Sequence, residues 1–443
     1  TMTFLCDKMI PSANIAQGIN VMAFDNGTQA PDMFKNININ VRKEQESAYK
    51  NDPFYKQFKS MKTSFNNAHP LYGQFIAVSA TDAALISVKG DSGESTWAIS
   101  QSVNGLNVSV ISDYAFWDAD SRIREVIVPK DMSYIGAKAF VKETGPIENV
   151  FFLGTNPTET MMSSKRFLLD DTGTDYSEFA GNTKVYVKKS AFEAYKTAFA
   201  KTVYDAATRK EIVSPFDYTA RFGYKVPAPH ITARYGTFAR EFDVDFSEYV
   251  QTTGTQVAAF TAATPIKKGT GDYGQSEYYV QMKSVDTYTH EPYTYVPQTI
   301  GGVLLKVLNG NRTTDDFFYT ISEKEVVVGP LSDGSLMRGA TYKDYITDSP
   351  NCYVMQDGQF RLLPTDTPTI IPVHKAFICL SDLPVGAKVD FGFTQEDGKT
   401  TGIESMNTIG ETDNAPYYNL NGQRVEQPQH GVYIHKGRKV VIK

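Results

Sequence analysis

The chain has 443 residues, a length that exceeds one ordinary hydrophobic core and predicts two to four domains. Hydrophobic residues make up 41% of it and charged residues 21%, which is typical of a soluble globular protein and excludes a disordered one. The net charge of −6 argues against a general nucleic-acid binder, and the lack of any run of about 18 apolar residues predicts no membrane span.

The first predicted elements are a strand over residues 37–41 and a short helix after it. Segment 41–50 of this unit recurs as 187–196, with Val, Ala, Tyr and Lys at matching places. A helix with a polar face at the end of a stack of strands prevents further pairing, so we expect both segments to be caps. Tyr49 and Tyr195 should then occupy equivalent positions, each on a helix that closes a stack.

A short internal repeat lies between these two segments. Ile-Ser-Asp-Tyr-Ala-Phe at 111–116 recurs as Ile-Gly-Ala-Lys-Ala-Phe at 135–140, and the strand-like run at 125–128 has an apolar counterpart at 149–152, displaced by the same interval. Such a unit cannot bury its own apolar face, whereas stacking on the next unit buries it. The repeat therefore predicts stacked turns, with Phe116 and Phe140 buried in equivalent positions.

The step at 135–140 and the Val-Ile-Val-Pro strand at 126–129 resemble the BspA-like leucine-rich repeats of surface proteins from gut and oral anaerobic bacteria. The segments similar to the entry strand and terminal cap of that family are 97–105, 152–157 and 185–189. The resemblance covers roughly residues 70–200, with a weaker match over 1–60. It implies a short leucine-rich repeat solenoid with small capping helices, and a role in cell adhesion at the cell surface.

The pattern changes from about Pro227 to strands separated by Gly, Pro, Asn and Asp turns, as in the runs at 296–306, 352–360 and 371–380. This spacing predicts an all-β, sandwich-like region. Residues 230–395 also resemble a module of exported proteins from the same bacteria. That resemblance implies a location and not a chemistry.

The last segment carries the turn signals Asn421-Gly422 and Lys436-Gly437 between short strands. It is similar to the C-terminal tail module of secreted and surface proteins in the same bacterial group, so we expect a secreted or surface location. The chain begins at Thr1 without a signal peptide, and we expect further residues upstream. The predicted organisation is mainly β, with the end of a first repeat block and its cap (1–62), a BspA-like leucine-rich repeat block with cap (63–213), a β-sandwich-like region (214–398) and a C-terminal β tail module (402–443).

One glycine-rich motif matches a nucleotide fingerprint. Residues 269–274 read G-x-G-x-x-G, but a strand-like run starts at Ser276, where a dinucleotide site requires a helix. We therefore expect a hairpin loop and no bound cofactor. The cysteines, Cys6, Cys352 and Cys379, include no CxxC pair, which leaves their disulfide state open.

Titratable and aromatic residues give no recognisable catalytic set. Asp243 and Asp245 alternate along a strand and would suit acid–base work or Ca²⁺, although a solvated strand face is the commoner arrangement, and the pairs at 170–171 and 315–316 are interpreted in the same way. No metal-ligand spacing links the histidines, which are His69, His230, His290, His374, His430 and His435. A dense tyrosine group is expected mostly in the core, and comprises Tyr278, Tyr279, Tyr288, Tyr293 and Tyr295.

These observations favour a non-catalytic adhesion or interaction protein that uses its repeats and sandwich as recognition scaffolds. We assign no catalytic, cofactor-binding or metal residues, and the ligand-binding residues stay unknown. The alternative is a glycan-binding protein for polysaccharide capture, suggested by the tyrosine group, and a third possibility is a hydrolase whose site is assembled from distant residues. The expected partner is a host or bacterial surface protein or glycan, with no nucleic acid and no membrane span.

Overall fold

The structure is a computed structural model of the whole chain. It describes residues 2–3, 37–53, 55–66, 73–89, 93–136, 138–157, 183–199, 202–205, 210–213, 221–228, 231, 234–270, 274–309, 317–325, 336–347, 351–356, 358–364, 368–385, 387–393, 405–406, 417–418, 424–425, 431–435 and 438–442. The fold is mainly β, as the sequence predicts. Every helix among these residues is too short or too polar to cross a lipid bilayer.

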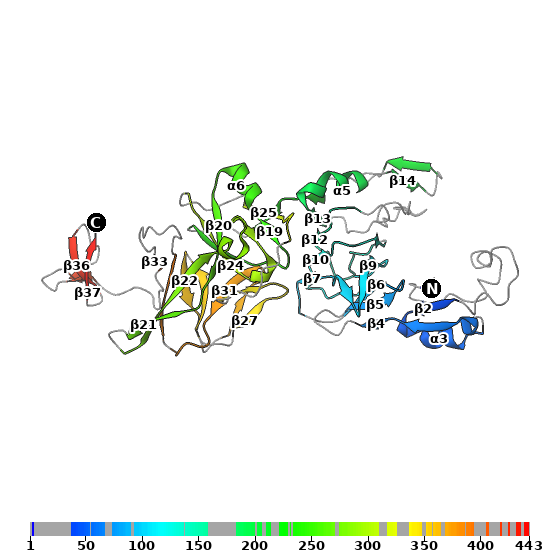
Figure 1. Cartoon of the computed structure of the whole chain (residues 1–443), viewed down its shortest axis with the longest axis horizontal. Helices are drawn as coiled ribbons and strands as arrows, with labels where there is room; N and C mark the ends of the chain where they lie inside the picture. Colours follow the sequence, from blue (N-terminus) through cyan, green and yellow to red (C-terminus); the bar gives the residue numbers. More distant parts are fainter. Residues whose placement is uncertain are drawn as a thin grey trace.

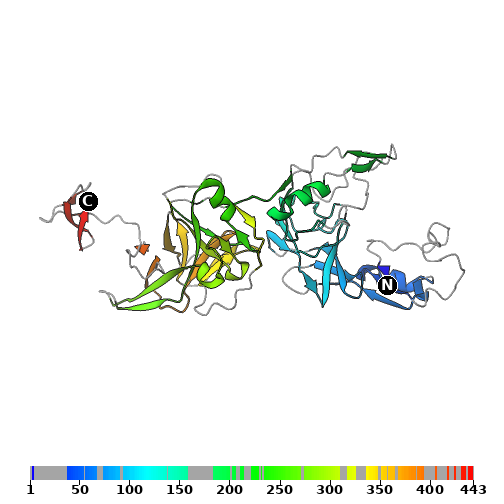
Figure 2. The same ribbon diagram turned by 45° about the horizontal axis from the view of Figure 1, so that its top comes forward.

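Figure 1 shows a part drawn in cyan to green beside a larger part drawn in green to orange, and Figure 2 shows the same two neighbours from another side. The first contains a parallel sheet and is called the parallel-sheet part, residues 65–199 with 221–223. The second contains two sheets packed on each other and is called the two-sheet part, residues 226–393 with 405–406.

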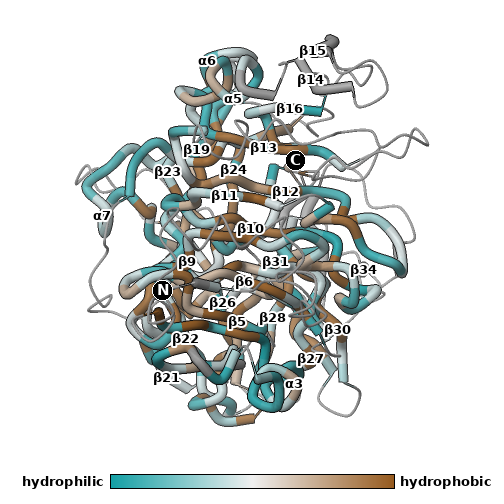
Figure 3. The backbone as a smooth tube through the Cα atoms, turned by 90° about the vertical axis from the view of Figure 1, so that its right-hand side faces the viewer, coloured by the Kyte–Doolittle hydropathy of each residue, from teal (hydrophilic) through white to brown (hydrophobic). Residues whose placement is uncertain are grey.

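Five short strands form the parallel sheet. In spatial order they are β7 (Thr96–Ala98), β10 (Glu125–Val128), β12 (Asn149–Phe152), β13 (Lys184–Val187) and β16 (Phe222–Gly223). Val126 lies beside Val150, and Val128 lies beside Phe152, so β10 and β12 pair in the register that the repeat predicts. Figure 3 shows β10, β12 and β13 as hydrophobic segments stacked one above another.

A second sheet covers the same core from the opposite side. Its strands, in spatial order, are β11 (Tyr134–Ile135), β9 (Leu106–Ile111), β6 (Asp82–Val88), β5 (Gly73–Ala77) and β4 (Phe65–Asn66), with β8 (Ser102–Val103) paired to β9. Phe116 and Phe140 are both fully buried between the sheets, with ring centroids 5.8 Å apart, so their predicted equivalence is confirmed. Gly136 is required here because a Cβ at this position would lie 2.2 Å from the backbone nitrogen of Asp113.

The two predicted cap helices are present. One unit is β2 (Asn38–Val41), η3 (Lys43–Gln45) and α3 (Glu46–Asn51), and the other is β13, η5 (Lys189–Ala191) and α5 (Phe192–Phe199). The three elements of the second unit follow their counterparts at one constant interval along the chain. Tyr49 and Tyr195 lie at equivalent places on these two helices, as predicted, and both side chains are buried.

The expectation that these helices end their sheets is wrong. β2 lies between β1 (Met2–Thr3) and β3 (Ser60–Thr63), and β13 pairs with β16 on its far side. Each helix covers the end of the apolar core but leaves the backbone edge of its strand free to pair. The N–H and C=O groups of that edge accept one more strand. Beyond α5, β14 (Thr202–Asp205) and β15 (Lys210–Val213) form a separate hairpin.

The two-sheet part has a shared core between a large and a small sheet. The large sheet has the order β18 (Tyr235–Phe238), β24 (Val303–Val307), β20 (Val257–Ala262), β22 (Ser276–Ser284), β32 (Lys388–Phe393) and β33 (Ser405–Met406), with β21 (Ile266–Thr270) paired to β22. The small sheet has the order β26 (Met337–Ala340), β31 (Lys375–Cys379), β28 (Cys352–Gln356) and β29 (Gln359–Leu362).

Shorter elements complete this part. They are β17 (Val226–Pro227), β19 (Val244–Asp245), β23 (Tyr295–Val296), β25 (Phe318–Ile321), β27 (Tyr345–Thr347), β30 (Thr369–Ile371), α6 (Ser247–Thr253), α7 (Asp286–Thr289) and η7 (Gln298–Ile300). The strand-like run at 296–306 is therefore interrupted, because Pro297 precedes η7 and Gly301 follows it with a φ of 83°. β24 begins only at Val303.

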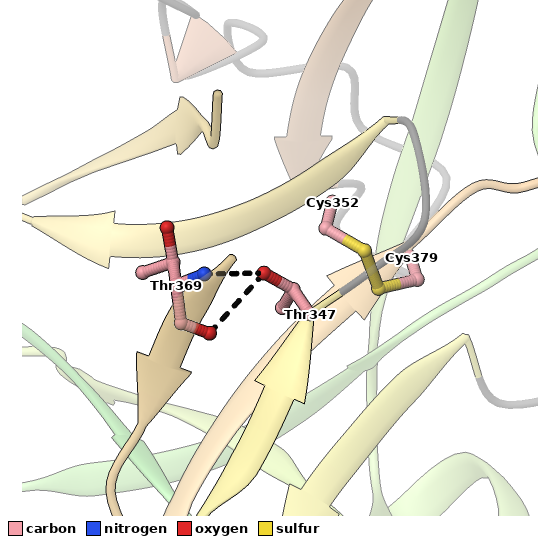
Figure 4. The surroundings of a disulfide bond; sticks show 4 residues. All are labelled: Thr347, Cys352, Thr369 and Cys379. Carbon is pink, nitrogen blue, oxygen red and sulfur yellow. Dashed lines mark hydrogen bonds between the residues drawn. A yellow bond between two sulfur atoms is a disulfide. The ribbon is translucent and has the colours of Figure 1, made fainter. Parts of the chain in front are cut away.

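A disulfide joins the small sheet internally. Cys352 on β28 lies directly opposite Cys379 on β31, and their sulfur atoms are bonded. Figure 4 shows this bond beside β27 and β30, where Thr347 Oγ1 donates a 3.2 Å hydrogen bond to the carbonyl oxygen of Thr369. The pairing answers a question that the sequence leaves open, while Cys6 lies outside the described residues.

The C-terminal strands form a four-stranded antiparallel sheet. Their order is β35 (Arg424–Val425), β34 (Tyr417–Tyr418), β36 (Gly431–His435) and β37 (Arg438–Ile442). β36 and β37 pair directly across the predicted turn at 436–437. The turn residues themselves, and the second predicted turn at 421–422, lie outside the described residues.

Candidate functional site

The outer face of the parallel sheet is covered by the two-sheet part. Side chains alternate between the two faces of a strand, so Val126 and Val128 point into the core of the parallel-sheet part. Ile127 and Phe151 point the other way and pack in one cluster with residues of the two-sheet part. Figure 1 shows β7, β10, β12 and β13 on the side that faces this neighbour. Most of this sheet face is therefore covered by the two-sheet part.

Polar contacts reinforce the apolar ones across this boundary. The backbone N–H of Ser95 donates a 2.8 Å hydrogen bond to the carbonyl oxygen of Tyr342. Further along the boundary, Lys189 Nζ lies 2.6 Å from Glu248, and Ser190 Oγ donates to Glu323 at 2.7 Å. The contacts begin at β7 and continue past β13, so they span the width of the sheet.

A cluster of charged side chains lies inside the boundary, centred on Arg240. The Arg240 side chain is only 4% exposed, and its Nη2 lies 2.9 Å from Glu125 Oε2 of β10. Its Nε lies 3.3 Å from Glu241, whose side chain is fully buried, and its Nη1 lies 3.0 Å from the ring nitrogens of His374. One guanidinium thus contacts two carboxylates and an imidazole from both parts of the molecule.

Neighbouring groups fix the Arg240 cluster in place. The Arg240 Cζ lies 4.7 Å from the ring centroid of Phe151 and 4.9 Å from that of Phe242, which are cation–π distances. Asn149 donates a 2.9 Å hydrogen bond to Glu125. Burial acts to raise the pKa of Glu125, but Arg240, His374 and Asn149 together hold that pKa below its ordinary value. The Glu125 carboxylate is therefore ionised at neutral pH.

A pocket of about 260 Å³ opens beside this cluster and is lined by Glu125, Asn149, Tyr186, Arg240, Tyr319 and His374 among others. Both carboxylates of the cluster are directed at Arg240, and a charged pair of this kind holds surfaces in register more readily than it transfers protons. We therefore assign the Arg240 cluster a structural role, in which it locks the two parts together.

A second hollow lies on the outside of the two-sheet part. This groove has a volume of about 290 Å³ and runs between β18, β28 and the segment from β30 to β31. Ile370 at its rim is 61% exposed and pairs across the β27–β30 hairpin with Ile346, which is 59% exposed. Side chains alternate between the two faces of a strand, and Tyr345 and Ile371 on the inner face of this hairpin pack against the sheet beneath. Ile346 and Ile370 therefore point outward.

Lys375 gives the groove a positive charge. It lines the groove and is half-buried, and burial lowers the pKa of its amine. Within the described part of the chain, Lys375 forms no ion pair with a carboxylate. The groove therefore combines apolar surface with a cation that has no acidic partner among the residues that the structure describes.

The aspartates singled out in the sequence have structural partners. Asp243 accepts hydrogen bonds from the Tyr295 hydroxyl at 2.6 Å and from the backbone N–H of Gln298 at 2.8 Å. Asp245 accepts one from the backbone N–H of Ser247 at 2.7 Å, at the start of α6. The two carboxylates therefore stabilise local backbone, and the pairs at 170–171 and 315–316 lie outside the described residues.

The other candidates are placed as follows. The hairpin expected at 269–274 is present, because β21 and β22 pair antiparallel, although residues 271–273 lie outside the described part. Of the five grouped tyrosines, Tyr295 is buried and the rest are half-buried. His290 is exposed at the end of α7, and His435 ends β36. His69, His230 and His430 are outside the described residues.

Sequence patterns did not single out Arg240, Glu241 or Glu125. One local signal was present, since Arg240-Glu241 interrupts the apolar run from Phe238 to Phe242 with two adjacent charges. Charged residues are rarely fully buried unless they are paired, so such an interruption indicates either an exposed edge or a buried ion pair. No group of three or more His, Cys, Asp or Glu side chains suited to a metal ion occurs among the described residues.

Comparisons with protein-family models, with curated proteins and with solved structures find no match to this chain.

Proposed function

We propose that this chain is a non-catalytic adhesion or interaction protein, secreted or held at a bacterial cell surface, that binds a protein partner through the groove beside β27 and β30. The exposed pair Ile346 and Ile370 is the observation that carries the proposal. Apolar side chains that remain in water next to a hollow are characteristic of protein-binding surfaces.

Further observations support the wider assignment. The repeat register of β10 and β12, with Gly136 at a close approach of two turns, supports a short BspA-like leucine-rich repeat solenoid. The disulfide between Cys352 and Cys379 supports an exported protein, because such bonds persist in oxidising compartments and are rare in the cytosol. The packing of the large sheet on the small one supports a β-sandwich.

The chemistry of the groove defines the partner. Ile370 offers apolar contact, and Lys375 supplies a positive charge that lacks a carboxylate among the described residues. The best-matched ligand is a segment of another protein that places an aliphatic or aromatic side chain next to Asp or Glu. Pairing a half-buried lysine with a carboxylate adds specificity, because a partner without the acid leaves the cation unpaired.

The test uses beads coated with the full chain and applied to epithelial or bacterial cells. We expect wild-type beads to adhere and Ile346→Ser/Ile370→Ser beads to lose most of that adhesion. Ile266→Ser is the matched control, because Ile266 is also 59% exposed but lies on β21, away from the groove. Its beads should adhere like the wild type.

Treatment of the cells identifies the chemistry of the partner. Protease treatment should abolish adhesion if the partner is a protein, whereas periodate, which oxidises sugars, should leave it intact. Equal adhesion by wild-type and Ile346→Ser/Ile370→Ser beads would refute the proposed groove. The non-catalytic assignment is tested with glycosidase, esterase and protease substrates, and turnover that disappears in Glu241→Gln, with its folding verified by circular dichroism, would refute it.

Glycan capture is the second candidate function. It is favoured by a different observation, an exposed Tyr114 and Trp117 pair on the parallel-sheet part. Aromatic rings in water are suited to sugar residues, whose C–H faces pack on aromatic faces. In the bead assay this function predicts the opposite outcome, with adhesion lost after periodate and kept after protease.

A further inference from the structure

Two aromatic side chains stand exposed on the turn between β9 and β10. Tyr114 is 39% exposed and Trp117 is 37% exposed, and they are the only large aromatic side chains with this exposure among the described residues. Their ring centroids lie 5.6 Å apart with an interplanar angle of 78°. In such an edge-to-face pair, the ring that offers its edge keeps its faces for other contacts.

The next turn of the same part serves as an internal control. At the equivalent repeat positions, Lys138 replaces Tyr114 and Val141 replaces Trp117. The two backbones match, with φ values of 54° at Tyr114 and 50° at Lys138. The backbone N–H of Trp117 donates a 3.0 Å hydrogen bond to the carbonyl oxygen of Tyr114. The backbone N–H of Val141 donates the equivalent bond, 3.1 Å long, to the carbonyl oxygen of Lys138. The turn therefore forms without aromatic residues at either position.

Backbone preference does not explain Tyr114 either. Its positive φ lies in the left-handed region, which glycine and asparagine occupy more readily than a bulky aromatic residue. If folding alone selected the residue at position 114, a residue such as glycine or asparagine would be favoured. Neither the repeat nor the local conformation accounts for a tyrosine and a tryptophan here. A contact with a molecule outside the chain would account for both.

The pair is held rigidly by its neighbours. Ala115 and Phe116, between the two aromatic residues, are fully buried and anchor the turn in the core. The Trp117 carbonyl oxygen accepts a 3.0 Å hydrogen bond from the N–H of Glu143 in the next turn. A surface whose backbone is already fixed loses little conformational freedom when a ligand binds.

Charged groups lie next to both residues of this pair. Lys138 Nζ lies 5.9 Å from the centroid of the Tyr114 ring. Beside Trp117, Asp118 forms an exposed ion pair with Lys89 at 3.4 Å. These groups are donors and acceptors at the rim of an aromatic patch, which is the arrangement that a ligand with one apolar face and many hydroxyl groups requires.

We propose that Tyr114 and Trp117 form a binding site for a carbohydrate, with one pyranose residue of a glycan stacked on an exposed ring and its hydroxyl groups bonded to the charged rim. The site rests on the second function proposed above and is independent of the groove beside Ile370. The patch is small for a protein partner, since a standard protein interface covers about 800 Å² on each side. The other exposed large apolar side chains among the described residues all lie in the two-sheet part: Ile266, Leu308, Ile346, Leu362, Ile370 and Val385.

The experiment measures sugar binding by the full chain. An array carrying maltoheptaose, cellohexaose, xylohexaose, chitohexaose and mannohexaose identifies the strongest binder, which is then titrated. Trp97 is 3% exposed, so quenching of fluorescence by iodide acts on Trp117. We expect the bound oligosaccharide to protect Trp117 from iodide.

The matched variant is Tyr114→Lys/Trp117→Val, which installs the residues that the next turn already uses in the same conformation. It should fold with an unchanged melting temperature and bind the sugar at least tenfold more weakly. Ile370→Ser, which alters the groove, should bind the sugar like the wild type. Absence of binding to every oligosaccharide on the array, or full binding by the double variant, would overturn the proposal.

The two proposals fail separately. Bead adhesion that depends on Ile346 and Ile370, without sugar binding, would leave the protein-binding groove and remove the carbohydrate site. Sugar binding that depends on Tyr114 and Trp117, together with adhesion that does not change in the isoleucine variant, would leave the carbohydrate site and remove the protein-binding groove.

Discussion

Replacing Arg240 with alanine removes the centre of the charged cluster between the two parts. The guanidinium lies 2.9 Å from Glu125 and 3.3 Å from Glu241, and the Glu241 side chain is fully buried. Removing one partner of a buried ion pair leaves an uncompensated charge, at a cost of about 3–5 kcal/mol in the free energy of unfolding. Both carboxylates are well shielded from solvent, so salt should screen this penalty little.

The loss should depend on pH. In the wild type the pKa of Glu125 is lowered, so its contribution to stability is present above the unfolded pKa of about 4.3 and is lost as the pH falls through the folded value. In Arg240→Ala, the burial that acts to raise this pKa is no longer opposed by the guanidinium. The charged carboxylate then destabilises the fold, and protonation relieves the penalty, so the variant should lose less stability at pH 5 than at pH 8.

Urea unfolding followed by tryptophan fluorescence measures this effect, because Trp97 on β7 is buried in the core of the parallel-sheet part. Arg122→Ala is the control: Arg122 forms a 2.8 Å ion pair with Asp120, but its side chain is 51% exposed, so we expect a loss of about 0.5 kcal/mol. A loss below about 1 kcal/mol for Arg240→Ala, or the same loss at both pH values, would refute the structural role of the cluster.

Three further changes test the packing. Phe140→Ala should lower the free energy of unfolding by about 3–5 kcal/mol, as measured by urea titration, and a loss under about 1 kcal/mol would contradict the stacked core. Reduction of the bond between Cys352 and Cys379, which are 27 residues apart, should cost about 3.5 kcal/mol, and an unchanged melting temperature in dithiothreitol would argue against it. Gly136→Ala should destabilise by about 1–3 kcal/mol, whereas Gly223→Ala, whose new Cβ would meet its nearest atoms at 3.5 Å, should melt like the wild type.

The repeat was predictable because it is local and periodic. Phe116 and Phe140 recur at the spacing at which successive turns stack, so the sequence specified both the turn and its buried ring. The continuation of the parallel sheet into β16 was not predictable, since that strand contributes only Phe222 and Gly223 and shows no pattern. Local periodicity thus identifies the unit and its position but not the strand that pairs with the last edge.

The residues that meet at Arg240 could not be identified from sequence for a different reason. Glu125, Arg240 and His374 lie far apart along the chain, and no spacing rule links them. Their proximity depends on the docking of one folded part on another, which is decided by shape and not by pattern. The groove was missed because a strand with one buried and one exposed apolar residue, such as Ile371 and Ile370, has the same apolar run as a strand buried on both faces.

The shared cluster of Ile127, Phe151 and their neighbours across the boundary affects how the chain can be divided. Residues 1–223 produced alone would present these two side chains to water, at a cost of about 1.5–3 kcal/mol each. The strands of this sheet are already formed, so the exposed apolar face is ready to associate with other copies of the same fragment. Fragments cut between the two parts should therefore precipitate or self-associate, and a study of the Tyr114 and Trp117 surface in isolation will need polar substitutions at Ile127 and Phe151 to keep that fragment in solution.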